Sequence, residues 1–172
     1  ELAKLKEVLT NPEPQGKDAK KFEAGVAWLL WMIGFNGVHL DGVPMFNHAP
    51  DLLVATPRGR FAAVECTVGH LKEDSKLLKL VERAKAIEAR LSEAGVNPSQ
   101  VLPILVTSKS REAVKGELKA ASEAGVHVLT RENLAAFSVS SLSPLNADRI
   151  YEEALNEVRS QQESGLMQQR LG

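Results

Sequence analysis

Two short runs decide the fold of this chain: Pro50-Asp51-Leu52-Leu53-Val54-Ala55 and, after a turn, Phe61-Ala62-Ala63-Val64-Glu65-Cys66-Thr67. Both runs are rich in Val, Leu and Ala, and the Pro57-Arg58-Gly59 segment between them favours a tight turn. We therefore predict two neighbouring antiparallel strands joined by a short loop. Asp51 opens the first strand, and Glu65 lies near the end of the second.

These two acids indicate a cation site. Each lies in a segment that is otherwise apolar enough to be buried, and a desolvated carboxylate is costly unless a cation or hydrogen bonds compensate it. Because side chains alternate along a strand, Glu65 and Thr67 share one face, which Asp51 can join, while Cys66 points to the other face. The alternatives are a turn cap for Asp51 and, for Glu65, a salt bridge to Arg60 or to a helix lysine.

The order of elements around the acids resembles that of the PD-(D/E)xK nucleases, which share the restriction-endonuclease-like fold. A helix with a Glu is followed by a strand that opens Pro-Asp, a hairpin, a strand that ends Glu-x-Thr, and a second helix. The similarity runs from about Lys17 to Val128. It implies a three-layer α/β core in which helices flank a mixed central β-sheet, in the order α-β-β-β-α-β-α-β-α.

The resemblance also assigns roles to individual residues. It implies that Asp51 and Glu65 are catalytic and hold Mg²⁺, for which Mn²⁺ would substitute, and that the backbone carbonyl of Cys66 completes the ligands. Carboxylates, a carbonyl and water suit this hard cation, which keeps several of its waters. Glu23, on the preceding helix, matches the family's accessory acid. The chain departs from the motif at Thr67, where the family has a lysine.

Lysines on the following helix are candidate replacements for that missing side chain. Lys72, Lys76 and Lys79 are spaced by four and three residues, which places them on adjacent turns of one helix face. In this family the lysine is sometimes supplied from that helix. We predict that Lys76 takes the role, with Lys72 as the second candidate and Lys79 as a substrate contact.

Two histidines flank the acids in the sequence. His48 and His70 have side chains suited to contacting phosphate or to proton transfer near neutral pH, and Thr67 is a further candidate contact to substrate. A zinc site is not expected, because the close His or Cys spacing of zinc motifs is absent. Cys66 is the single cysteine, so an internal disulfide is excluded. This composition is compatible with a reducing cytosol, and we expect a cytoplasmic location.

Size and charge limit what the chain can do. At 172 residues it is long enough for one full core and too short for two ordinary domains. Its net charge of -1 gives no overall attraction to nucleic acid, so a DNA-binding surface must be a local patch. The segment from His70 to Arg90 is the candidate, with six Lys or Arg against four acids. No membrane partner is expected, because no run approaches the ~18 apolar residues of a membrane span.

We divide the chain into three parts. Residues 1–16 form a linker or frayed helix, residues 17–138 form the nuclease-like α/β domain, and residues 139–172 form a C-terminal helix with a disordered tail from Gln161. The sequence begins with Glu1 rather than Met, so other domains of a longer parent chain are expected partners. A homodimer is expected as well if duplex DNA is cut in pairs, since that needs two active sites.

The first helix of the nuclease-like part is strongly apolar. Its inward stripe has helical spacing and consists of Phe22, Val26, Leu29, Leu30 and Ile33. Trp28 and Trp31 lie on the same helix. We expect them to pack in the core rather than to stack on bases, since a helix this apolar is mostly core.

The sequence therefore predicts a Mg²⁺-dependent endonuclease that hydrolyses phosphodiester bonds in DNA, as the nuclease domain of a larger restriction, defence or repair protein. A second hypothesis, favoured by Thr67, is a catalytically degenerate nuclease fold that binds nucleic acid or supports assembly. A third is a generic α/β domain whose acids are structural. Asp51 and Glu65 on opposite faces of the sheet would select the third.

Overall fold

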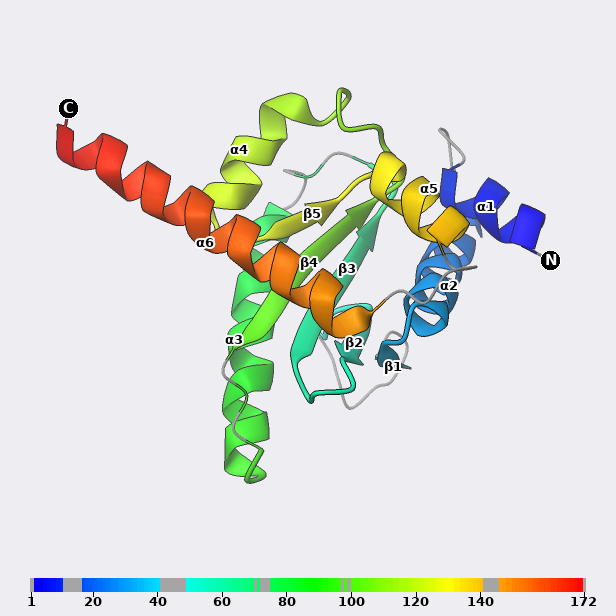
Figure 1. Cartoon of the computed structure of the whole chain (residues 1–172), viewed down its shortest axis with the longest axis horizontal. Helices are drawn as coiled ribbons and strands as arrows, with labels where there is room; N and C mark the ends of the chain where they lie inside the picture. The colour runs from blue at the N-terminus through cyan, green and yellow to red at the C-terminus, as the bar shows by residue number, and fades with distance from the viewer. Residues whose placement is uncertain are drawn as a thin grey trace.

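The computed structural model describes residues 2–10, 17–40, 49–69, 71, 75–96, 98, 100–140 and 146–171. Over these residues the strands are β1 (Asn36–His39), β2 (Leu52–Ala55), β3 (Phe61–Thr67), β4 (Val101–Thr107) and β5 (His127–Leu129). They form one sheet in that order (Figure 1). The β1–β2 and β2–β3 pairs are antiparallel and the β3–β4 and β4–β5 pairs are parallel, so the sheet is mixed.

Helices lie on both faces of the sheet. They are α1 (Leu2–Thr10), α2 (Lys17–Met32), α3 (Lys76–Glu93), α4 (Lys115–Glu123), α5 (Arg131–Ser140) and α6 (Ala147–Leu171). Helices α3 and α4 contribute to the core on one face, and α1, α2, α5 and α6 contribute to the core on the other (Figure 1). From α2 to α5 the elements follow the predicted order. The predicted α/β class, with a mixed sheet between helices, is confirmed.

The β2–β3 hairpin is formed as expected from its two apolar runs. Its strands pair from Leu52 opposite Val64 to Ala55 opposite Phe61, and Gly59 in the turn has φ 73°, a conformation that glycine adopts readily. Side chains of β3 alternate between the two cores, and Leu52 and Val54 of β2 belong to the core on the α2 side. The neighbouring β4 is buried at all seven positions, which is typical of a parallel strand covered on both faces.

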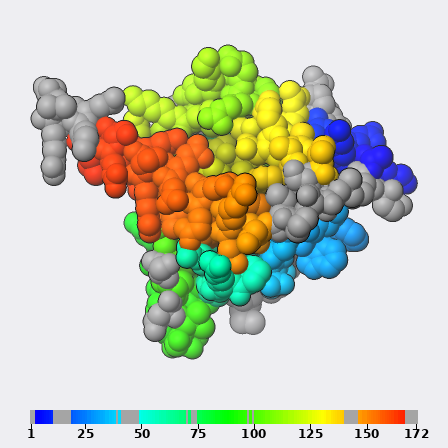
Figure 2. Space-filling view, in the orientation of Figure 1, coloured from blue at the N-terminus to red at the C-terminus, as the bar shows by residue number. Residues whose placement is uncertain are grey.

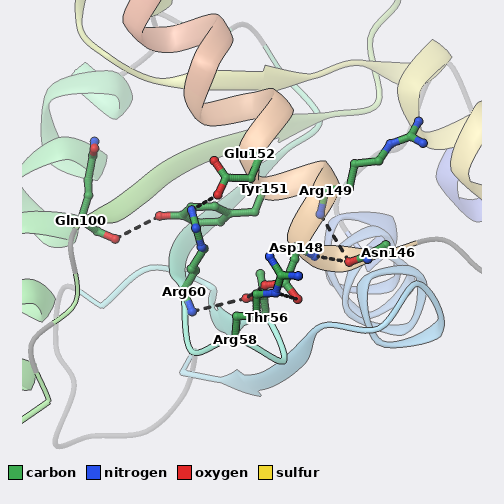
Figure 3. A network of polar contacts seen from close by, with 9 residues as sticks. All are labelled: Thr56, Arg58, Arg60, Gln100, Asn146, Asp148, Arg149, Tyr151 and Glu152. Atoms are coloured by element: carbon green, nitrogen blue, oxygen red, sulfur yellow. Dashed lines mark hydrogen bonds and ion pairs between the residues drawn. The ribbon is translucent and has the colours of Figure 1, made fainter.

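A polar network fixes α6 to the turn of this hairpin (Figure 3). The buried carboxylate of Asp148 accepts a hydrogen bond of 2.5 Å from the Thr56 hydroxyl. The Tyr151 hydroxyl donates to the backbone carbonyl of Gln100 at 3.0 Å, and the Arg60 guanidinium lies 5.8 Å from the centre of the Tyr151 ring. Figure 2 shows α6 lying across this face of the molecule, beside α5. The network lies at the turn of the hairpin, whereas the two acids lie at its other end.

The C-terminal segment corrects one prediction. Disorder was expected from Gln161 onward, but α6 continues as a helix to Leu171. The Gln162 side chain still reaches the core domain, where its amide nitrogen would lie 2.6 Å from a Cβ added to Gly125. The segment is polar but rich in Gln, Glu, Leu and Arg, which favour helix. Its polarity therefore indicates exposure of a helix rather than disorder.

The tryptophans of α2 correct a second prediction. Trp28 is 64% exposed and Trp31 is 66% exposed, so neither packs in the core. Only one side of α2 faces the sheet, and the predicted apolar stripe fills it completely. The two indole rings are left on the outward side of the helix.

The N-terminal segment contributes more than a linker. Leu9 of α1 is fully buried, and α1 packs against α2 and α5. Gly25 of α2 allows this close approach, because a Cβ at that position would lie 3.2 Å from the Val8 side chain. Within the parts of the chain that the structure describes, no helix combines the length and apolar character needed to cross a membrane.

Candidate active site

The two acids meet where β2 begins and β3 ends. Continuing the Leu52–Val64 register by one residue would set Asp51 opposite Glu65 on one side of the sheet, and both residues line the same pocket. Asp51 Oδ2 accepts a hydrogen bond of 2.7 Å from the backbone N–H of Cys66. The opposite-face arrangement that would favour purely structural acids is therefore not observed.

A pocket of about 340 Å³ opens at this edge of the sheet. It is lined by side chains or backbone from α2, the start of β2, the end of β3 and the start of α3. Six of the predicted site residues share it: Glu23, Asp51, Glu65, Cys66, Thr67 and Lys76. Segments more than 50 residues apart in the sequence thus supply one pocket.

The Glu65 carboxylate is held in an unfavourable electrostatic environment. Burial raises the pKa of Glu65 above its usual value, and the neighbouring Asp51 carboxylate raises it further. Arg83 of α3 opposes this shift through an ion pair with Nη1 2.5 Å from Glu65 Oε2, and Lys76 opposes it more weakly. The pKa of Glu65 remains raised despite these two cations, and burial is the largest cause.

Glu23 also lies close to this group. Burial raises the pKa of the Cys66 thiol well above its usual value, and the carboxylates of Asp51, Glu23 and Glu65 raise it further, in that order. All three carboxylates belong to residues that line the pocket with Cys66. The thiol is therefore neutral at physiological pH and unsuited to act as a nucleophile.

Lys76 brings its ammonium group to the position of the missing lysine. Its Nζ donates a hydrogen bond of 3.1 Å to Thr67 Oγ1, and this hydroxyl oxygen also accepts from the backbone N–H of Gly69 at 3.2 Å. Lys76 is the first residue of α3, and the preceding Ser75 has φ 58°. A non-glycine residue in this left-handed region is uncommon and sets the entry of the chain into α3.

Other predicted residues lie elsewhere. Lys79 is exposed and lines a separate groove of about 660 Å³ between α3 and the β2 side of the sheet. It is not part of the pocket that holds the acids. Lys72, His48 and His70 lie outside the described residues.

Arg83 is the residue that the sequence reasoning missed. The alternative partners considered for Glu65 were Arg60 and a helix lysine, but Arg60 forms an ion pair with Glu152 of α6 instead. The partner of Glu65 is therefore a cation on the following helix, as one alternative proposed, but it is an arginine rather than a lysine. Its signal was available in the spacing, because Arg83 lies seven residues after Lys76 and therefore on the same face of α3.

The residues of this pocket that could hold a metal ion offer oxygen atoms. Among the residues that the structure describes, no group of three or more His, Cys, Asp or Glu side chains is arranged to hold one ion. Mg²⁺ needs only one or two carboxylates, with water and substrate phosphate as further ligands. Asp51, Glu65 and the Cys66 carbonyl can supply that smaller set, with Glu23 beside it.

Comparison of the chain with protein-family models and with curated proteins gives no match.

Proposed function

We propose that the protein is a Mg²⁺-dependent endonuclease that hydrolyses phosphodiester bonds in DNA. The observation that carries this proposal is the Lys76 ammonium on the Thr67 hydroxyl, in one pocket with Asp51 and Glu65. Two carboxylates and one ammonium are the groups that the resemblance requires, and here the ammonium comes from α3 rather than β3. The restriction-endonuclease-like fold remains part of the proposal.

Each side chain has a distinct task in this reaction. Asp51 and Glu65 would hold Mg²⁺, which when bound neutralises phosphate charge and acidifies water. Lys76 would orient the attacking water and stabilise the negative charge that develops on the phosphate oxygens. The water oxygen bonds to phosphorus as one phosphorus–oxygen ester bond breaks. The water gives up a proton to solvent, and the departing oxygen takes one from solvent.

Cleavage of plasmid DNA tests this function. The wild-type protein is expected to cut in Mg²⁺ or Mn²⁺ and to be inactive in EDTA, whereas Asp51→Ala and Glu65→Ala should remain folded by circular dichroism and cut nothing. Glu112→Gln is the control, because Glu112 is an exposed acid whose ion pair is with Lys115 in the next helix. Cleavage that survives in Glu65→Ala would remove the mechanism.

The second candidate is a degenerate nuclease fold that binds nucleic acid without cutting it. The ion pair between Arg83 and Glu65 favours it, because the guanidinium already neutralises an acid that a metal ion would need. In that case calorimetry with Mg²⁺ and Mn²⁺ gives no binding heat and no substrate is cut, while DNA still binds. Cleavage by the wild-type protein rejects this candidate.

A further inference from the structure

The outward side of α2 carries two large aromatic side chains in water. Trp28 and Trp31 are about two-thirds exposed, and residues three apart are neighbours on a helix surface. Scattered exposed apolar residues are normal, but two adjacent exposed indoles on a short helix are unusual. Such a pair indicates a binding surface rather than core packing.

Lysines share this surface. Lys20 and Lys21 are exposed on the same helix, and Ala24 lies between them and the tryptophans. At 3.6 residues per turn these positions fall within about 100° of the helix circumference. We call these five residues the α2 stripe: Lys20, Lys21, Ala24, Trp28 and Trp31. Positive charge beside exposed aromatic rings complements a ligand that has both anionic groups and flat π faces.

The stripe is continuous with the candidate active site. Lys20 lines the 340 Å³ pocket together with Glu23, Asp51 and Glu65. From Lys20 to Trp31 the helix rises about 16 Å, since each residue adds about 1.5 Å. That length matches about five stacked nucleotides at 3.4 Å each. A strand that passes the acids can therefore run along α2.

We propose that the α2 stripe binds an unpaired nucleic-acid strand. Trp28 and Trp31 stack on its bases, and Lys20 and Lys21 contact its phosphates next to the pocket. Aromatic side chains and a basic track are the elements by which proteins bind single strands without reading sequence. The inference rests on the proposed function in one respect, because it names single-stranded or locally melted nucleic acid as the substrate of the same pocket.

Intrinsic fluorescence tests the stripe directly, because Trp28 and Trp31 are the only tryptophans in the sequence. In EDTA, where no cleavage occurs, a short oligothymidylate is expected to quench this fluorescence and to bind more weakly as salt rises. An abasic oligonucleotide of the same length should bind by charge alone and leave the fluorescence unquenched. The same titration with an oligouridylate shows whether the stripe binds RNA as well as DNA. Stacking of either strand on the tryptophans supports the inference.

Substitutions show which residues of the α2 stripe contribute to the free energy of oligonucleotide binding. Affinity is measured by anisotropy of a labelled oligothymidylate, and Trp28→Ala and Trp31→Ala should each weaken it by about 10-fold. Lys20→Gln should reduce the slope of log affinity against log salt by about 1. The matched controls are Leu78→Ala, another residue 64% exposed but on α3, and Lys119→Gln, an exposed lysine of α4.

The outcomes separate this inference from the proposed function. Stacking on the stripe without any cleavage in Mg²⁺ supports the inference and rejects the nuclease. Cleavage in Mg²⁺ with unchanged oligonucleotide affinity in both tryptophan variants supports the nuclease and overturns the inference. If Trp28→Ala instead converts a dimer into a monomer and leaves oligonucleotide affinity unchanged, a second copy of the chain covers the stripe and the inference is likewise overturned.

Discussion

Removing the Lys76 ammonium from the candidate site is the sharpest perturbation that the pocket allows. Lys76→Ala removes the group that donates to Thr67 Oγ1 at 3.1 Å. Loss of a preorganised electrostatic donor typically lowers kcat by about 10²–10³-fold, or about 2.7–4 kcal/mol. We therefore expect Mg²⁺-dependent cleavage to fall by that factor.

The same substitution should affect stability only slightly. Thr67 is buried, but its hydroxyl keeps the hydrogen bond from the Gly69 N–H at 3.2 Å, so no buried polar group loses its last partner. Lys76 itself is half-exposed, and a contact of this kind contributes at most about 1 kcal/mol. For a chain of this size that corresponds to a fall in Tm of about 2–4 °C.

Restoring the lysine at the motif position tests the geometry. In Lys76→Ala/Thr67→Lys the new side chain starts where Thr67 now meets the ammonium and has the space that Lys76 vacates. We expect the cleavage rate to recover to within about 10²-fold of the wild-type rate. The remaining loss is expected because a misplacement of about 1 Å in a catalytic group can lower the rate by that factor. Lys79→Ala is the control, because Lys79 is exposed three residues further along the same helix and lines the other groove.

Initial rates of supercoiled plasmid nicking, with folding checked by calorimetry, provide the assay. The reasoning is refuted if Lys76→Ala cuts at the wild-type rate. It is also refuted if Lys79→Ala loses as much activity as Lys76→Ala, because the effect would then come from general charge on α3.

Three other expectations follow from the contacts described above. Asp148→Ala leaves the buried Thr56 hydroxyl without its acceptor, which costs about 1–3 kcal/mol and lowers Tm by about 2–12 °C in calorimetry; an unchanged Tm would contradict the docking role of Asp148. The raised pKa of Glu65 means that the folded protein holds this proton more tightly than the unfolded chain, so the stabilisation is present at low pH and lost as pH rises through the raised pKa. Glu65→Gln should therefore have a higher Tm than the wild-type protein at pH 7, and the same Tm as the wild-type protein below the usual pKa of a glutamate. If the two proteins have the same Tm at pH 7 as well, the pKa of Glu65 is not raised by burial. The Cys66 thiol should react with a thiol reagent at pH 8 only after denaturation, and rapid reaction in the folded protein would show that its pKa is not raised.

Local sequence pattern was sufficient for the framework of the fold. The two apolar runs, the turn residues and the acid at each strand end predict the β2–β3 hairpin, because pairing register and alternation follow from the strands themselves. The spacing of Lys72, Lys76 and Lys79 places them on one face of the next predicted helix, and the resemblance made Lys76 the favoured candidate, which lines the pocket with the acids. These features depend on residues that are close together in the sequence, so they can be predicted from the sequence alone.

Features set by packing between distant elements were not predictable in the same way. The exposure of Trp28 and Trp31 is an exception, because helical spacing places both residues opposite the predicted apolar stripe, and only the apolar composition of α2 concealed it. Spacing places Arg83 on the same face of α3 as Lys76, but which side chain of that face reaches Glu65 depends on how α3 crosses β3. The helical path of α6 beyond Gln161 depends on helix propensity, which the polarity of the segment conceals.

The most direct test of the account is calorimetric titration of Mn²⁺ into wild-type protein, Asp51→Asn and Glu65→Gln. The account predicts binding of a divalent cation to the wild-type protein and loss of that binding in both variants, because each removes one of the two carboxylate ligands. Binding heats that are the same in all three proteins, or no binding to the wild-type protein, would contradict the claim that Asp51 and Glu65 together hold a metal ion.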